Sequence, residues 1–229
     1  MKRSWWLIVL ISVVTVSLNI ANSATIYIPG DFSDIQGGID AASDGDVIMI
    51  AGGTYIGEGN RNLTWDGHLK HLTITSQNGP EETIIDCQQA GRAFEFKQSG
   101  QNLADRIEGL TIINAMSKMG GAILCDGVSL SFSDCYFQDN ATQGDLGFGG
   151  AIYLINSTSS VQQCDFTSNN STQSGAAIYG FSSELLIEEC HFEGNYTPIN
   201  GGAIGLCQDD STIISCGFEQ NEADKGGAV

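Results

Sequence analysis

Three side chains that can take part in acid–base chemistry occupy equivalent positions in a repeated pattern. Tyr136, Asp165 and His191 each lie between the Cys and the Phe of a Cys-x-Phe-x-x-Asn motif. A phenol, a carboxylate and an imidazole can exchange protons or hold a polar ligand. If the motifs stack roughly 4.8 Å apart, the three side chains form one outward row. We therefore name them as candidate catalytic residues. The simpler interpretation is that three unrelated polar residues face solvent, as most such residues do.

Three short clusters contain residue types that bind metal ions: Asp44-x-Asp46, Asp66-x-His68-x-x-His71 and Asp209-Asp210. Carboxylates in such polar segments commonly accept hydrogen bonds from their own turn, and a calcium site needs more oxygen ligands than these spacings offer. The calcium-binding nonapeptide repeat of some solenoids is absent from the sequence. We therefore predict turn roles for these residues, with no metal site and no cofactor site.

An internal repeat defines the elements that position the candidate residues. Its first part is Gly-Gly-Ala-Ile or a close variant, beginning at Gly120, Gly149, Gly175, Gly201 and Gly226. Its second part is Cys-x-Phe-x-x-Asn, beginning at Cys135, Cys164, Cys190 and Cys216. The first Gly precedes the next Cys by 15 residues in every copy, so all length variation falls between the Asn and the next Gly. Rigid units joined by one variable turn are typical of a solenoid.

The pattern inside each repeat predicts short strands separated by corners. The Cys and the Phe are two residues apart, so they face the same side of a strand. An apolar residue also precedes each Cys by three positions: Phe132, Val161, Ile187 and Ile213. The change from a step of two to a step of three marks a corner. Together these features predict an all-β parallel β-helix, with one coil per repeat. An antiparallel sandwich also uses short strands, but it does not require identical residues at fixed spacing.

Stacked coils place equivalent side chains in columns. We expect a ladder of hydrogen-bonded amides along the repeat Asn residues, with Asn114 extending the series by one coil: Asn140, Asn169, Asn195 and Asn221. Asn also tolerates the left-handed backbone that a corner requires. The four repeat cysteines share an interior column whose spacing of roughly 4.8 Å exceeds the usual Cβ separation in a disulfide. We predict that they are buried free thiols. The pairing of the other three cysteines stays open: Cys87, Cys125 and Cys207.

The chain begins with the features of an export signal. Lys2 and Arg3 precede an apolar run from Trp5 to Val14, and small residues follow up to Ala24. This order is typical of a secretory signal peptide, here residues 1–24, and the run is short for a membrane span. The sequence therefore predicts an exported protein that is extracellular or held at the cell surface or outer membrane.

Residues 25–106 are predicted to form an N-terminal cap and the first coils. Ser33-x-x-Gln36 has the form of a capping box, and Ile35 and Ile39 fall on one face of a short helix that Gly45 would end. Such a helix can cover the open end of a stacked core. Residues 107–229 form the regular repeats, and because they stop within a fifth Gly-Gly-Ala motif we expect the repeats to continue beyond residue 229.

The charge of the chain argues against two classes of partner. The 27 Asp and Glu residues outnumber the 9 Lys and Arg residues, which gives a formal net charge of −18. A surface of this sign repels phosphate backbones and anionic lipid headgroups. We therefore predict no nucleic-acid partner and no electrostatic docking on a membrane.

Two segments resemble known families. Residues 34–42, followed by Gly45-Asp46-Val47 and Gly53-Thr54-Tyr55, resemble the start of right-handed parallel β-helix domains of the pectin-lyase-like superfamily. Residues 120–229 resemble the repeats of chlamydial polymorphic membrane proteins, which carry Gly-Gly-Ala-[Ile/Leu/Val] and Phe-x-x-Asn. The first resemblance implies an all-β, right-handed parallel β-helix solenoid with a short N-terminal capping helix. The second implies an exported surface or outer-membrane protein, often adhesive, that is anchored through a C-terminal part absent from these residues.

Many members of the pectin-lyase-like superfamily act on polysaccharides, which supplies an alternative function. Lyase chemistry on uronates needs a cation beside the substrate carboxylate and a base, commonly Arg or Lys. After the signal peptide the chain has three arginines, Arg61, Arg92 and Arg106, and all precede the regular repeats. We therefore predict a structural or adhesive protein that presents a face to a glycan or cell-surface ligand. The alternative is a polysaccharide lyase or hydrolase whose site lies near residues 61–106 or beyond residue 229.

Overall fold

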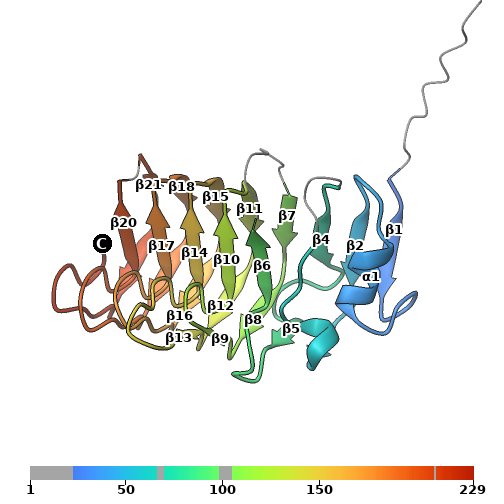
Figure 1. The fold of residues 1–229 in the computed structure, drawn as a ribbon, viewed down its shortest axis with the longest axis horizontal. Coiled ribbons are helices and arrows are strands. Elements are labelled where there is room, and N and C mark those ends of the chain that lie inside the picture. Colours follow the sequence, from blue (N-terminus) through green and yellow to red (C-terminus); the bar gives the residue numbers. More distant parts are fainter. Residues whose placement is uncertain (1–22, 66–69, 98–104, 209) are drawn as a thin grey trace, which may run out of the picture.

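The computed structural model describes residues 23–65, 70–97, 105–208 and 210–229, which form an elongated parallel β-solenoid (Figure 1). The predicted signal peptide therefore lies outside the described residues, apart from its last two positions. Asp66, His68 and Asp209 of the proposed turn clusters also lie outside them. Among the described residues, no helix is long and apolar enough to cross a membrane.

Three parallel sheets run along the solenoid. The eight-stranded sheet contains β1 (Thr25–Ile28), β2 (Val47–Ile50), β4 (Thr73–Ser76), β7 (Asp105–Glu108), β11 (Leu130–Ser133), β15 (Thr158–Gln162), β18 (Glu184–Glu188) and β21 (Thr212–Ile214). The seven-stranded sheet contains β3 (Gly53–Tyr55), β5 (Thr83–Asp86), β8 (Thr111–Ile113), β12 (Tyr136–Gln138), β16 (Asp165–Thr167), β19 (His191–Glu193) and β22 (Gly217–Glu219). The five-stranded sheet contains β6 (Phe94–Lys97), β10 (Ile123–Asp126), β14 (Ile152–Ile155), β17 (Ile178–Phe181) and β20 (Ile204–Cys207). A short pair, β9 (Met116–Ser117) and β13 (Ala141–Thr142), lies in the variable turns.

Equivalent residues of successive repeats pair in register, as the repeat predicts. Phe137 pairs with Phe166 and Phe166 with Phe192, and these rings are fully buried. Both ring pairs stack with centroids 4.9 Å apart and planes within 6° of parallel. The predicted all-β parallel solenoid is therefore confirmed, and its core is a set of columns that run the length of the molecule.

The corners that follow the strands of the seven-stranded sheet use left-handed residues, but one predicted position is wrong. The left-handed residue precedes each ladder Asn, as at Asp139 before Asn140, where φ is 55°. Asn114 has φ 54° and follows Ile113, which pairs with Gln138, so Asn114 aligns with the corner residue Asp139. Asn114 is therefore a corner residue and does not extend the ladder, which begins one coil later.

The predicted amide ladder is present from Asn140 onward. The Nδ2 atom of each Asn donates to the Oδ1 atom of the next, at 3.1 Å from Asn140 to Asn169 and 3.0 Å from Asn169 to Asn195. Each Nδ2 also donates to a backbone carbonyl of the preceding coil, such as Phe137 O at 2.9 Å from Asn169. Since these three Asn side chains are at most 1% exposed, the ladder satisfies polar groups inside the core.

The two glycines of the Gly-Gly-Ala motif meet different steric constraints. Its first residue has a left-handed backbone, as at Gly120 with φ 60°. Its second residue lies against the backbone of the next coil, because a Cβ atom added at Gly150 would be 2.1 Å from the carbonyl oxygen of Ala176. The first position needs glycine for its backbone angles, and the second leaves no room for a side chain at Gly150, although Ala176 occupies the same position in the next copy.

The predicted N-terminal helix is α1 (Ile35–Ala41), with a different N-cap. Asp34, and not Ser33, is the cap, and its Oδ1 atom accepts the N–H of Gly37 at 2.9 Å. The helix ends at Ala41, before the predicted Gly45. Ile35 and Ile39 are fully buried, and the helix packs on β1 and β2 at the blue end of the solenoid (Figure 1). A 3₁₀ turn, η1 (Glu58–Asn60), packs beside it.

All seven cysteines are free thiols. Cys135, Cys164 and Cys190 form the predicted interior column, and each is at most 2% exposed. The column continues to Cys216, which is half-buried in the last coil. Of the cysteines outside the column, Cys87 and Cys125 are also buried.

Candidate functional site

The structure brings the candidate catalytic residues into one row on the outer face of the seven-stranded sheet. Tyr136 on β12 pairs with Asp165 on β16, which pairs with His191 on β19. Each is half-buried, because its side chain points outward while the flanking Cys and Phe point into the core. The predicted juxtaposition is therefore present.

The row carries only weak signs of catalytic chemistry. Burial raises the pKa of Tyr136, and the charge of Asp165 adds to that shift. The Nε2 atom of His191 lies 3.9 Å from the Oε1 atom of Glu219, one coil further along. Among the described residues no hydrogen bond joins Tyr136, Asp165 and His191 to one another. An acid–base pair would need such a contact, or a bound substrate, to pass a proton.

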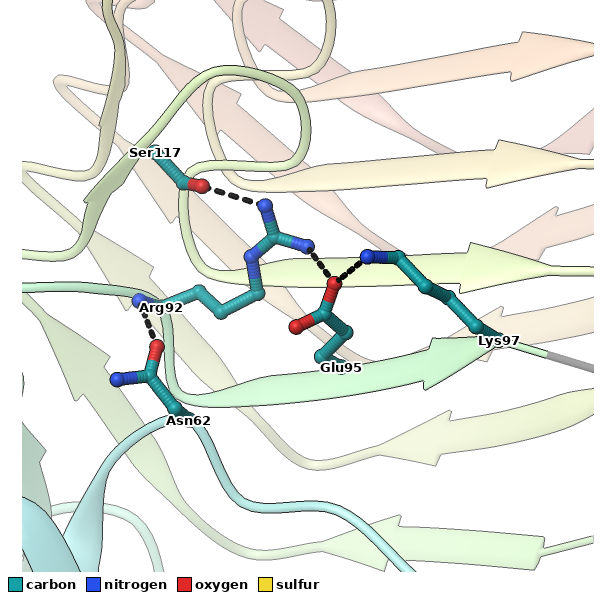
Figure 2. Close-up of polar contacts among 5 residues, drawn as sticks. All are labelled: Asn62, Arg92, Glu95, Lys97 and Ser117. Carbon is teal, nitrogen blue, oxygen red and sulfur yellow. Dashed lines mark hydrogen bonds and ion pairs between the residues drawn. The ribbon is translucent and has the colours of Figure 1, made fainter.

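Arg92 is a candidate cation for the alternative lyase function, but neighbouring side chains already bind its guanidinium group (Figure 2). The Nη1 atom of Arg92 donates to the Oε1 atom of Glu95 at 3.2 Å, and Nη2 donates to the hydroxyl of Ser117. Lys97 contacts the same Glu95 oxygen, and the backbone N–H of Arg92 donates to Asn62 Oδ1 at 3.2 Å. Burial lowers the pKa of Arg92, while Glu95 opposes that shift. With both terminal nitrogens engaged and the residue 8% exposed, Arg92 ties neighbouring coils together.

The other two arginines lie on different elements of the fold. Arg106 lies outward on β7, with 63% of its side chain exposed, 3.8 Å from Glu108. Arg61 follows η1 and is half-buried. Within the described ranges, no group of three or more His, Cys, Asp or Glu side chains could hold a metal ion.

The predicted turn role is visible at Asp44-x-Asp46, the one cluster whose residues all lie in the described ranges. Asp46 accepts the N–H groups of Ala24 and Ser43, at 2.7 and 2.8 Å. Asp44 Oδ1 accepts the backbone N–H of His71 and lies 2.7 Å from its Nδ1 atom. The backbone bond is the main cause of the lowered pKa of Asp44, and the contact with the imidazole adds to it.

A groove that the sequence did not single out crosses the outer face of β11, β15, β18 and β21. Its volume is about 380 Å³, and an adjoining hollow of about 420 Å³ extends it over the turns that precede these strands. Both hollows are lined by Thr158, Glu184 and Asp210. The groove spans four adjacent strands, or roughly 14 Å along the solenoid axis at the usual strand spacing.

Hydroxyl groups dominate the wall of this groove. They come from Ser129, Ser131, Thr158, Ser159, Ser160 and Thr212. Leu186 is the outward apolar residue of the groove, whereas Leu130 and Leu185 beneath it point into the core and are 1% exposed. Ser131, Ser160 and Thr212 share one outward row, in which Leu186 lies between Ser160 and Thr212. Repetition of one row along stacked coils gives the groove a linear set of hydrogen-bonding groups.

Sequence reasoning missed the groove because it searched for acid–base pairs and metal ligands. The available signal was the recurrence of Ser and Thr where each repeat passes from its Gly-Gly-Ala strand to the next strand. Examples are Asn156-Ser157-Thr158 and Ser182-Ser183-Glu184. Alignment of these short segments into one hollow depends on the coil register.

The fold and the in-register columns define a parallel β-helix protein. Residues 121–227, within the regular repeats, match the family described as the right handed beta helix region. Searches of curated proteins and of solved structures gave no match. The predicted right-handed β-helix is thus confirmed, while the resemblance to polymorphic membrane protein repeats stays a prediction.

Proposed function

We propose that this protein is an exported β-helix scaffold that binds a glycan at the cell surface in a structural or adhesive role. The groove over β11, β15, β18 and β21 carries this proposal. Its hydroxyls, together with the carboxylates of Glu184 and Asp210, match the hydrogen-bonding needs of a polyhydroxylated ligand. The outward Leu186 offers apolar contact to the C–H groups of sugar rings, as ligand sites that combine apolar walls with a few polar groups do.

The linear form of the groove favours a chain over a small molecule. Equivalent positions recur from coil to coil in the row of Ser131, Ser160 and Thr212, so successive units of a polymer meet similar groups. Export rests on the predicted signal peptide, and surface attachment rests on the repeat resemblance. A rigid scaffold with a linear binding groove is suited to adhesion because the protein need not change shape to engage its ligand.

Binding of the full chain to a panel of neutral and uronate polysaccharides tests the proposal. Ser160→Tyr places a large side chain in the groove from an outward position, and we expect it to weaken glycan binding by tenfold or more, equal to about 1.4 kcal/mol. The matched control is Thr167→Tyr, also outward but on the seven-stranded sheet. If no polysaccharide binds, or if both variants weaken binding equally, the groove is not a glycan site.

The alternative of a polysaccharide-active enzyme has one observation in its favour, the placement of Asp165 between Tyr136 and His191. Incubation of the same panel with the full chain would then release unsaturated or reducing ends. Asp165→Ala would abolish that release, while Glu193→Ala on the same face would not. Turnover of this kind would replace the adhesive proposal with an enzymatic one, whereas binding without turnover supports the adhesive function.

A further inference from the structure

Within the five-stranded sheet, β14 and β17 are apolar on both faces, whereas Glu95 and Lys97 of β6 and Asp126 of β10 point outward. In β14, Ile152 and Leu154 point into the core and are fully buried, while Tyr153 and Ile155 point outward. In β15, by contrast, buried Val161 alternates with outward Ser160 and Gln162. Parallel strands that are apolar on both sides are typical of a sheet covered on both faces. The outer face of β14 and β17 therefore has the composition of an interface.

This outer surface, which we call the apolar face, is formed by two rows of side chains and one residue of a variable turn. It consists of Leu124, Phe148, Tyr153, Ile155, Tyr179, Phe181 and Cys207. The centroid of the Tyr179 ring lies 4.7 Å from that of Phe148 and 5.6 Å from that of Tyr153. The Tyr179 ring leans over Gly205, since a Cβ atom added there would be 2.8 Å from Tyr179 Cδ2.

The described elements leave much of the apolar face open. Ile155, Tyr179 and Phe181 are half-exposed. In the view of Figure 1, β10, β14, β17 and β20 lie at the front with no described helix over them, and α1 packs at the opposite end on β1 and β2. The variable turn that carries Phe148 also exposes 71% of Leu146. Aromatic residues clustered on an exposed apolar surface mark interaction sites in soluble proteins.

The charge around the apolar face selects the kind of partner. Residues 120–229 contain 14 Asp and Glu residues, no Arg and a single Lys, Lys225. Asp126 lies in the same outward row as Ile155 and Phe181, with Lys97 on its other side, and Asp145 precedes Leu146. A second copy of the chain brings the same acidic groups, so like charges would oppose self-association. A partner with cationic groups beside apolar side chains would bind through both the apolar surface and the surrounding acidic residues.

We infer that the apolar face binds a basic amphipathic polypeptide segment, which places aromatic or aliphatic side chains on Tyr179 and Phe181 and Lys or Arg side chains beside Asp126 and Asp145. This inference is independent of the proposed glycan groove, which lies on the eight-stranded sheet. Protein interfaces commonly have aromatic residues at the buried centre and charged residues at the solvent-exposed rim.

Fluorescence anisotropy with the full chain and three labelled peptides tests the inference. The peptides alternate Leu with Lys, Leu with Glu, or Ser with Lys. We expect the Leu–Lys peptide to bind at least tenfold more tightly than either of the others, because only it supplies both apolar and cationic groups. Phe181→Ser should weaken Leu–Lys binding about tenfold. The outward control Tyr136→Ser, on the seven-stranded sheet, should leave it unchanged.

Several results would overturn the inference. Equal binding of the Ser–Lys and Leu–Lys peptides would show attraction by net charge alone. Equal losses in Phe181→Ser and Tyr136→Ser would place binding elsewhere. Self-association in sedimentation experiments that Phe181→Ser abolishes would identify a second copy as the occupant. Circular dichroism of both variants shows whether the solenoid remains folded, and Asp126→Asn provides a second variant that keeps the apolar surface intact.

Discussion

Replacement of Asn169 by Ala tests whether the amide ladder stabilises the stacked coils. The Oδ1 atom of Asn169 accepts the backbone N–H and the Nδ2 group of Asn140, both at 3.1 Å. Its Nδ2 atom donates to Phe137 O at 2.9 Å and to Asn195 Oδ1 at 3.0 Å. Asn169→Ala removes these four hydrogen bonds while keeping the backbone bond from Asn169 N to Asn195 Oδ1.

The expected loss follows from this number of contacts. At a net value of about 1 kcal/mol for each hydrogen bond, the variant loses about 4 kcal/mol of unfolding free energy. The site is 1% exposed, so water does not replace the lost side chain. The N–H of Asn140 also loses its acceptor, and a buried unpaired donor is costly. This loss is a large fraction of the stability of an ordinary domain.

Urea unfolding followed by circular dichroism measures the change, and two variants serve as controls. Asn170→Ala changes an exposed neighbour, and we expect an effect within about 0.5 kcal/mol. Asn114→Ala removes one bond to Asp86 at 3.1 Å and places Ala at φ 54°, so a loss of about 2 kcal/mol is expected. A loss below about 1 kcal/mol for Asn169→Ala, or no larger than that for Asn114→Ala, would refute the reasoning.

Three further predictions concern backbone packing, thiol burial and pH. Gly150→Ala puts a Cβ atom 2.1 Å from a backbone oxygen of the next coil. At Gly144 no atom lies within 4 Å of an added Cβ, so Gly144→Ala costs only the left-handed strain of about 1 kcal/mol. We therefore expect Gly150→Ala to lower stability to urea several times more than Gly144→Ala. Alkylation of the native chain, located by mass spectrometry, should label half-buried Cys207 well before Cys164, whose pKa burial raises; early labelling of Cys164 would contradict the packed column. Burial raises the pKa of the Asp105 carboxyl to about 6, so the folded state is favoured when this group is protonated. The chain should therefore lose about 3 kcal/mol of unfolding free energy as pH rises from about 4 through about 6. Asp105→Asn should remove that loss in pH-dependent unfolding, and an unchanged pH profile would exclude Asp105 as its source.

The regular part of the fold was predictable because its physical constraints recur once in every coil. A fixed distance from Gly-Gly-Ala to Cys-x-Phe-x-x-Asn leaves one register, in which the Phe, Cys and Asn columns must form. The same register placed Tyr136, Asp165 and His191 side by side. The errors fell where a single residue lacks that repetition. Asn114 looks like a ladder residue by type and spacing but lies one position early, and Asp34 displaced Ser33 as the helix cap.

The surface features of the solenoid depend on contacts between side chains that the repeat pattern does not predict. The sequence alone does not show what Arg92 contacts, but in the structure its guanidinium donates hydrogen bonds to Glu95 and Ser117. The hydroxyl groove exists only because short turn segments from several coils line one hollow. By itself the sequence determined the repeat, the corners and the buried columns, since each follows from the spacing of residues along the chain. The tertiary structure decided which outward residues meet across coils, because exposure and neighbours depend on how three sheets and their turns enclose one core.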